Sequence, residues 1–137
     1  MEITDEELIK RAKRVAKSRK VSSDVRTGAV VCALITDKGN MYLGASIAAS
    51  CGIGFCAEHS AIASMVTNQE YGIKRIVAVA SDGKILPPCG RCRELMYQIN
   101  NRNLDTDIII DTNKTAKLKE LLPEIWQKRF YRKRQRN

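Results

Sequence analysis

Two cysteine motifs constrain this chain more than any other feature of its sequence. The first is "FCAEHSA", residues 55–61, and the second is "PPCGRCRE", residues 87–94. Together they hold three cysteines, and the first motif places a glutamate two positions after its cysteine. Clustered thiolates are typical of metal sites, and zinc in particular. A fold for this chain must therefore bring two segments that are distant in sequence to one point.

The length of 137 residues fits one domain with a core of its own. Hydrophobic residues make up 44% and charged residues 28%, which argues against a disordered, collagen-like or membrane-spanning chain. We predict a single domain over residues 1–127 and a basic C-terminal tail over residues 128–137. Residues 128–136 carry most of the net charge of +9, because six of them are basic and none is acidic.

The N-terminal segment "MEITDEELIKRAKRV" holds no apolar run long enough for a signal peptide or a membrane helix. We therefore expect a cytoplasmic location and no membrane partner. The chain has five cysteines, and an odd number without an export signal makes structural disulfides a poor interpretation. Metal ligands or redox groups fit such cysteines better.

Helices and strands are expected to alternate along the chain. Thr4 as an N-cap and apolar residues at helical spacing predict a first helix to about Lys20. A β-hairpin follows, and then a helix, a strand, a helix, a strand, a short strand or turn, and a final helical stretch interrupted at Pro123. The segments that carry these patterns are "TGAVVCALIT" and "MYLGASIA" for the hairpin, then "FCAEHSAIASMVT", "IKRIVAVAS", "CGRCRELMYQINN", "TDIIID" and "KTAKLKELLPEIWQKRF". This order predicts a three-layer α/β/α sandwich around a central mixed sheet, with the later strands parallel.

Both cysteine motifs fall at predicted helix N-termini. Cys56 begins the second helix, and Cys89 and Cys92 begin the third. Each helix follows a strand of the same sheet, so the three thiols can converge, and helix N-termini lower the pKa of thiols. Three protein ligands leave one corner of a zinc tetrahedron open, as catalytic sites do. Glu58 stands two positions into the helix, where it can carry protons without binding the metal.

A Cys-x-Glu segment followed by Pro-Cys-x-x-Cys is the arrangement of the zinc nucleobase deaminases. "CAEHSA" and "PPCGRCREL" together resemble the cytidine deaminase superfamily, in its small three-cysteine form. The segments "TGAVV", "GASI" and "LKELLPEIW" are similar to its first strand, second strand and closing segment. The resemblance implies Cys56, Cys89 and Cys92 as zinc ligands, Glu58 as the proton shuttle, and a homotetramer.

The chain also departs from that family. Cytidine deaminases generally carry an aromatic residue before the first-strand Gly-Ala, and an Asn and a Glu in "GxNxE" that hold the ribose. The corresponding residues here are Val25, Ser46 and Ala48. Together with "CREL", these changes make the chain closer in character to the blasticidin S deaminase branch. The substrate of that branch also presents a cytosine, but it carries a different sugar and a charged arm.

We therefore predict a zinc-dependent aminohydrolase of the cytidine deaminase type, which acts on cyclic amidines. It would convert the exocyclic amine of a cytosine-type nucleoside or analogue, such as cytidine, deoxycytidine or a blasticidin S-like compound, to a carbonyl with release of ammonia. The resemblance places substrate contacts at Ser46, Ala57 and Pro88.

Two alternatives stay open at this point. One is a deaminase that edits nucleic acid, because the basic tail could neutralise phosphates, although a solvated chain end is the commoner meaning of such a tail. The other is a zinc-binding module without catalysis, which would need a fourth ligand. In the family that the chain resembles, this segment closes over the active site of a neighbouring subunit. The resemblance therefore implies that Trp126, Phe130 and Tyr131 serve assembly or a substrate lid rather than a polynucleotide.

Four residues near these motifs have less definite roles. Cys32 is expected in the core of a strand. Cys51 either lines the pocket or is an incidental loop thiol, and Phe55 packs either against the base or in the core. His59 is often Arg in three-cysteine members, and it is expected to point away from the site if Glu58 points into it.

Overall fold

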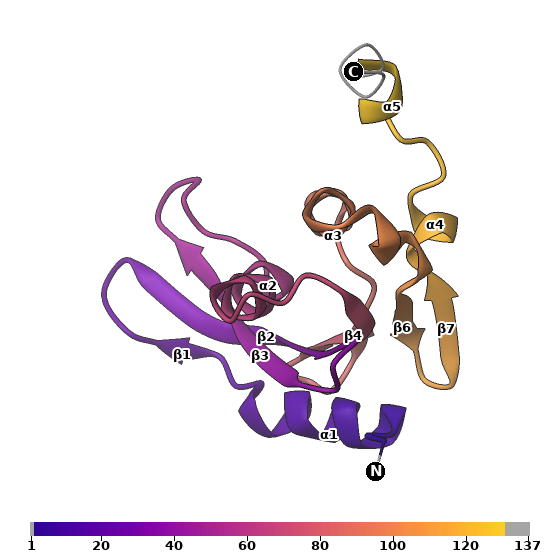
Figure 1. Ribbon diagram of the computed structural model, residues 1–137. Helices are drawn as coiled ribbons and strands as arrows, with labels where there is room; N and C mark the ends of the chain where they lie inside the picture. Colours follow the sequence, from indigo (N-terminus) through magenta and orange to yellow (C-terminus); the bar gives the residue numbers. More distant parts are fainter. Residues whose placement is uncertain (1, 131–137) are drawn as a thin grey trace.

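A computed structural model describes residues 2–130 of the chain (Figure 1). Most of the predicted basic tail, residues 128–137, lies outside the described residues, and so does Tyr131. Among the helices of residues 2–130, none combines the length and the apolar character that crossing a membrane requires.

A mixed β-sheet forms the centre of the molecule. Strand β2 pairs antiparallel with β3 on one edge and with β4 on the other, and β4 pairs parallel with β6. Short strands extend the sheet where β1 pairs with β2, β5 with β4 and β7 with β6. The strands are β1 (Arg19–Lys20), β2 (Val25–Thr36), β3 (Met41–Ala49), β4 (Ile73–Ala80), β5 (Ile85–Leu86), β6 (Asp107–Asp111) and β7 (Lys114–Lys117).

Helices cover both faces of this sheet (Figure 1). Helix α1 packs on one face around Leu8 and Ala12, whereas α2 and α3 pack on the other around Met65 and Met96. The helices are α1 (Asp5–Val15), α2 (Ala57–Thr67), α3 (Gly90–Ile99), the 3-10 helix η1 (Asn101–Asp105), α4 (Leu118–Leu121) and α5 (Gln127–Phe130). The predicted α/β/α sandwich with a mixed sheet is confirmed, and the parallel pair β4–β6 agrees with the prediction for the later strands.

The first helix is shorter than predicted. It ends at Val15, where Ala16 acts as the C-cap, and the chain then forms β1 rather than another helical turn. Gly28 has a φ of +80°, and a Cβ there would lie 2.4 Å from the carbonyl oxygen of Lys17. The backbone of Lys17 therefore lies directly against Gly28 of β2. The segment after α1 follows this strand, so the helix cannot continue to Lys20.

Gly44 in β3 sets the position of α2 against the sheet. A Cβ at Gly44 would lie 2.1 Å from the backbone nitrogen of Ala61 and 2.7 Å from the carbonyl oxygen of Ala57. The helix backbone therefore rests directly on the strand. At the end of β3, Ile47 and Phe55 exchange backbone hydrogen bonds of 2.9 and 3.0 Å, which fix the loop that leads to Cys56.

Candidate metal centre and active site

Three thiols come together where α2 and α3 begin. Cys56 is the N-cap of α2 and Cys89 is the N-cap of α3, as their motifs predicted. Neither side chain caps its own helix, so both sulfur atoms are available to the site. The Sγ atom of Cys89 lies 3.3 Å from that of Cys56 and 3.5 Å from that of Cys92.

This cluster suits zinc in its number of donors, their chemistry and their spacing. All three Sγ atoms lie within 4.8 Å of one another. Sulfur atoms at about 2.3 Å from a tetrahedral zinc ion are about 3.8 Å apart, so little movement would be needed to bind one. Within residues 2–130, no fourth Cys, His, Asp or Glu ligand atom belongs to the group. Three soft donors with an open fourth position fit the predicted Zn²⁺.

The three thiols differ in pKa. Burial raises the pKa of Cys92 far above its ordinary value, and it also raises the pKa of Cys56. Burial acts on Cys89 too, but hydrogen bonds from the backbone of Cys92 and from the Cys56 thiol outweigh it and lower the pKa of Cys89. Cys89 is thus the first of the three to become a thiolate, and the others need a cation to ionise readily.

A cleft of about 420 Å³ opens beside the thiols. The predicted residues Ser46, Ala57 and Glu58 line it together with Cys56 and Cys89. The remaining lining residues are Val30, Ile47, Ala48, Gly54, Phe55, Ala78, Leu86, Pro87 and Arg91. Residues from both motifs and from the end of β3 therefore meet in one cavity, mostly apolar and with few polar groups, as small-molecule sites are.

Glu58 is the acid of this cleft, and it is only 4% exposed. Burial raises its pKa above the ordinary value for a carboxyl, and its own backbone N–H offsets this in part. A raised pKa keeps the carboxyl closer to neutrality than an exposed glutamate, which suits a group that must both accept and return a proton.

The predicted substrate residues occupy different parts of the site. The Oγ atom of Ser46 accepts a hydrogen bond from the backbone N–H of Val30 at 3.1 Å, where the pairing of β2 and β3 shifts register. Its hydroxyl proton can still be donated into the cleft. Pro88 is buried behind Glu58, in a small hollow also lined by Ile76, whereas its neighbour Pro87 lines the cleft itself.

The prediction that His59 points away from the site is wrong. Its Nδ1 atom lies 3.9 Å from the Sγ atom of Cys92. The prediction assumed that a residue one position after Glu58 lies on a face of the helix that is turned away from the site. However, the first turn of α3 lies beside the first turn of α2, so Cys92 of α3 contacts His59 there. Burial, and then the charge of Arg91, lowers the pKa of His59, so the ring is neutral near pH 7.

The structure also places the residues whose roles the sequence left open. Phe55 lines the cleft, and its ring centroid is 6.0 Å from that of His59. Cys32 is fully buried in the core, as expected, whereas Cys51 is exposed and is not among the residues that line the cleft. Arg91 lines the cleft and was not predicted to; the signal for it is its position one residue before Cys92, in the exposed first turn of α3.

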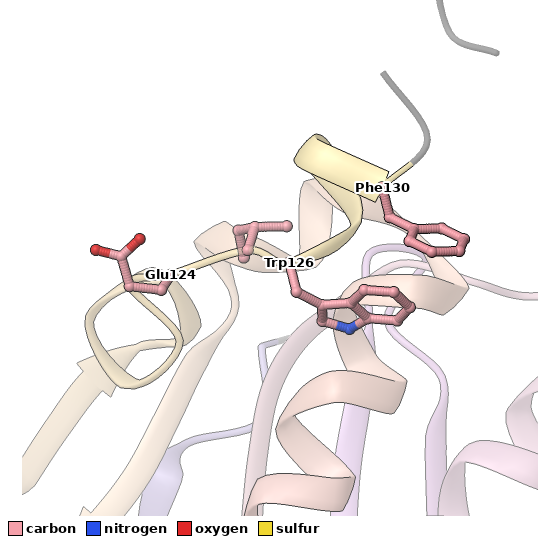
Figure 2. A pocket seen from close by; sticks show the side chains of 4 residues that line it. Glu124, Trp126 and Phe130 are labelled. Atoms are coloured by element: carbon pink, nitrogen blue, oxygen red, sulfur yellow. The ribbon is translucent and has the colours of Figure 1, made fainter. Parts of the chain in front are cut away.

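A larger hollow of about 560 Å³ lies elsewhere, at the C-terminal segment. Glu124, Ile125, Trp126 and Phe130 line it, and the rings of Trp126 and Phe130 are 5.6 Å apart (Figure 2). It has the greater volume but only one titratable side chain among its lining residues, so the smaller cleft at the thiols is the better candidate for chemistry.

Comparison with known proteins identifies the family. Residues 2–105 match the family described as the cytidine and deoxycytidylate deaminase zinc-binding region. The chain belongs to this family. Its sequence is 34% identical to a cytidine deaminase of Halalkalibacterium halodurans over 71 residues, which is 51% of this chain and 54% of that protein. It is 27% identical to a cytidine deaminase of Mycobacterium tuberculosis over 97 residues, or 70% of this chain and 71% of that one.

The fold is also that of a solved cytidine deaminase. The crystal structure of cytidine deaminase from Mycobacterium leprae superposes with a TM-score of 0.73 at 26% identity, covering 90% of this chain and 100% of that one. These similarities confirm the predicted superfamily and fold, and they support the predicted class of enzyme, a zinc-dependent deaminase.

Proposed function

We propose that this protein hydrolyses the exocyclic amine of a cytosine-type nucleoside or nucleoside analogue, releasing ammonia and leaving a carbonyl on the ring. The observation that carries the proposal is the meeting of a buried carboxyl, Glu58, with the Cys56 and Cys89 thiols at the wall of one cleft, with the Cys92 thiol beside that of Cys89. Cys56, Cys89 and Cys92 would hold the zinc ion. The zinc ion, when bound, supplies a Lewis acid that lowers the pKa of a water molecule toward neutrality.

Glu58 moves the protons in this reaction. Its carboxylate accepts a proton from the attacking water and gives it to the ring nitrogen next to the amine-bearing carbon. The new carbon–oxygen bond forms while the ring nitrogen takes up that proton. Glu58 then transfers the second proton of the water to the leaving amine, and the carbon–nitrogen bond breaks to give ammonia and a ring carbonyl.

The other cleft residues would hold the base. Phe55 offers an aromatic surface, and Leu86 and Ala78 add apolar ones. Ala57 begins α2, where backbone N–H groups lack partners inside the helix and can bind the ring edge. The hydroxyl of Ser46 can donate to the sugar or ring, since its oxygen already accepts from Val30.

The relatives found by comparison are cytidine deaminases, so cytidine and deoxycytidine come first as candidate substrates. A blasticidin S-like substrate is the finer proposal. It is supported by Ser46 and Ala48, which stand where the resemblance leads one to expect the ribose-binding Asn and Glu. Neither side chain can make the contacts that an Asn or Glu makes to two sugar hydroxyls.

The test is an ammonia-release assay of the zinc-loaded protein with cytidine, deoxycytidine, cytosine, blasticidin S and adenosine. The same assay on the Glu58→Gln variant is the control. Turnover of a cytosine compound that the variant lacks supports the proposal. Zinc at one ion per chain with no turnover of any compound contradicts it and favours a zinc module without catalysis.

A homotetramer remains part of the proposal, because the resemblance implies that assembly. Trp126 and Phe130 are 50% and 71% exposed in the single chain, as residues that another subunit covers would be. Sedimentation velocity on the full chain tests this, and a monomer at micromolar concentration contradicts it.

A further inference from the structure

Arg93 lies in the first turn of α3, one residue after Cys92, and its side chain is half-buried. It is not among the residues that line the cleft, so it takes no direct part in the proposed chemistry. Its guanidinium group binds two backbone carbonyls instead. The Nε atom donates to the carbonyl oxygen of Pro88 at 2.8 Å, and Nη1 donates to that of Leu121 at 3.1 Å. Arg93 therefore joins the start of α3 to the end of α4.

The backbone of Arg93 makes a further contact with the same turn. Its N–H donates to the carbonyl oxygen of Cys89 at 3.0 Å. The carbonyls of Pro88 and Cys89 belong to the two peptide groups that flank the Cα atom of Cys89, and Arg93 binds both. A peptide group is planar, so a hydrogen bond to its carbonyl restrains the whole group. With both planes restrained, the Cβ of Cys89 has one direction, and only rotation about its Cα–Cβ bond remains to place the sulfur.

The position of this sulfur decides the geometry of the thiol cluster. The Sγ atom of Cys89 lies 3.3 Å from that of Cys56 and 3.5 Å from that of Cys92, so it contacts both of the other thiols. Metal–ligand distances in protein sites keep to their usual values within about 0.2 Å. A turn that let Cys89 move would therefore weaken metal binding by the whole cluster.

The first cysteine motif is held by the sheet rather than by a side chain. The carbonyl just before its cysteine is that of Phe55, which accepts from the backbone N–H of Ile47 at 3.0 Å. In the second motif, two prolines precede the first cysteine, and a proline has no N–H with which to pair to a neighbouring strand. A side chain takes the place of the strand there, and it is that of Arg93.

The same contact restrains a wall of the catalytic carboxyl. Pro88 is buried, and it lines a small hollow together with Glu58. At the other end of the contact, Leu121 is the last residue of α4, where helix carbonyls lack partners inside the helix. The bond to that carbonyl gives the guanidinium a second anchor, outside the cysteine turn.

We propose that Arg93 is a positioning residue of the active site, which sets the position of the Cys89 thiol by holding the peptide groups on both sides of it. A planar guanidinium donates from two nitrogens at fixed angles, whereas a lysine ammonium is a point charge on a flexible stem and cannot bind both carbonyls in the same way. The inference rests on the proposed function for the role of the thiols as metal ligands. It adds a residue outside the cleft on which the metal centre depends.

The variants Arg93→Ala and Arg93→Lys, made in the full chain, test this role. Both should bind zinc about 10- to 100-fold more weakly in competition with a chelator, as loss of an outer hydrogen bond at a metal site typically does. Cobalt(II) in place of zinc gives an absorption spectrum that reports the ligand geometry, and its bands should shift or lose intensity in both variants. With a substrate that is turned over, kcat should fall about 10- to 100-fold and KM should change little, because Arg93 does not line the cleft.

Two controls separate positioning from a general loss of stability. Arg102→Ala removes an exposed arginine from η1. Glu70→Gln weakens hydrogen bonds that a buried carboxylate accepts from Thr36 and Asn40, past the opposite end of α2 from the thiols. Glu70→Gln should therefore lower stability without disturbing the cysteine turns, and both controls should keep the zinc affinity and the cobalt spectrum of the wild type.

A wild-type zinc affinity and cobalt spectrum in either Arg93 variant would overturn the proposal, so the test stands if one of the two does not fold. Equal changes in Arg93→Ala and Glu70→Gln would overturn it as well, since the effect would then be one of stability alone. Zinc affinity and the cobalt spectrum need no substrate. A wild-type protein without turnover, whose metal site still depends on Arg93, would support this inference and overturn the proposed activity instead.

Discussion

The two ends of α2 each present a buried glutamate, and their surroundings are opposite. Glu58, in the first turn, lies in the cleft, where burial raises the pKa of its carboxyl. Glu70 lies just past the last turn, where hydrogen bonds from Thr36 and then Tyr42 lower the pKa of its carboxyl. The side chains are 4% and 6% exposed. Burial alone therefore does not distinguish a catalytic carboxylate from a structural one, and the donors around it do.

The donors at Glu70 join separate parts of the chain. Its carboxylate accepts from the Thr36 hydroxyl at 2.6 Å, from the Asn40 side-chain amide at 2.9 Å, and from the Tyr42 hydroxyl. These residues lie at the end of β2, in the turn, and at the start of β3. A carboxylate that is satisfied in this way is fixed as an anion and holds the hairpin to the helix. The pKa of Glu58 is raised instead, which suits a carboxyl that accepts and returns a proton.

The largest expected effect is that of Glu58→Gln on the reaction. Glutamine has nearly the same shape but cannot accept and return a proton, so kcat/KM should fall by about 10²- to 10⁴-fold. Zinc content and the midpoint of thermal unfolding should not fall, because no structural contact is lost. Ammonia release, metal analysis and a melting curve check the three expectations. Residual activity close to the wild type would remove Glu58 from its proposed role.

Cys92→Ser tests the other half of the same site. Cys92 is buried and its thiol needs a cation to ionise, so replacement by a harder oxygen should reduce zinc content and lower the unfolding midpoint of the purified protein. Metal analysis and calorimetry measure both. Cys51→Ser is the matched control, since Cys51 is exposed and does not line the cleft. Equal zinc in the two variants would contradict the three-thiol centre.

His59 sharpens the comparison, because it lies at the same end of α2 as Glu58 and contacts the Cys92 thiol. A neutral imidazole whose Nδ1 donates to the Cys92 sulfur would stabilise the thiolate and hold it in position. Loss of such a contact typically costs about 10- to 100-fold in metal affinity, so His59→Ala should weaken zinc binding by that factor. Competition with a zinc chelator measures it. His59→Gln, which keeps a donor, should recover part of the loss, and unchanged affinity in His59→Ala would contradict the contact.

The sequence alone predicted those features of the fold that depend on residues close together in the chain. Cys56 and Cys89 were predicted at helix starts because the glycines and prolines just before them end the preceding loops, which is a local signal. The alternation of helices and strands followed from periodicity. His59 was misplaced, because its neighbour is on another helix. The strand Arg19–Lys20 was missed for a similar reason, since two residues form a strand only through their partners in β2. Arg91 was missed as a cleft residue because the cleft forms only after the helices have packed.

The smallest effect on activity, and the clearest contrast, is expected from Glu70→Gln. A glutamine cannot accept all three hydrogen bonds, so the free energy of unfolding should fall while kcat/KM stays unchanged. The pKa of Glu70 is lowered in the folded protein, so its carboxylate contributes stability above its ordinary pKa of 4.5, and this contribution is lost as the pH falls through the lower folded value.

The stability difference between wild type and Glu70→Gln should therefore be full near neutral pH and should narrow below about pH 4.5. Urea unfolding at a series of pH values measures it, with Glu124→Gln as the control at an exposed glutamate. A difference that stays constant with pH would mean that the Glu70 carboxyl does not titrate with folding. A fall in kcat/KM that matches that of Glu58→Gln would remove the distinction between the two ends of α2, because the carboxylate that the hydrogen bonds hold would then also serve the reaction.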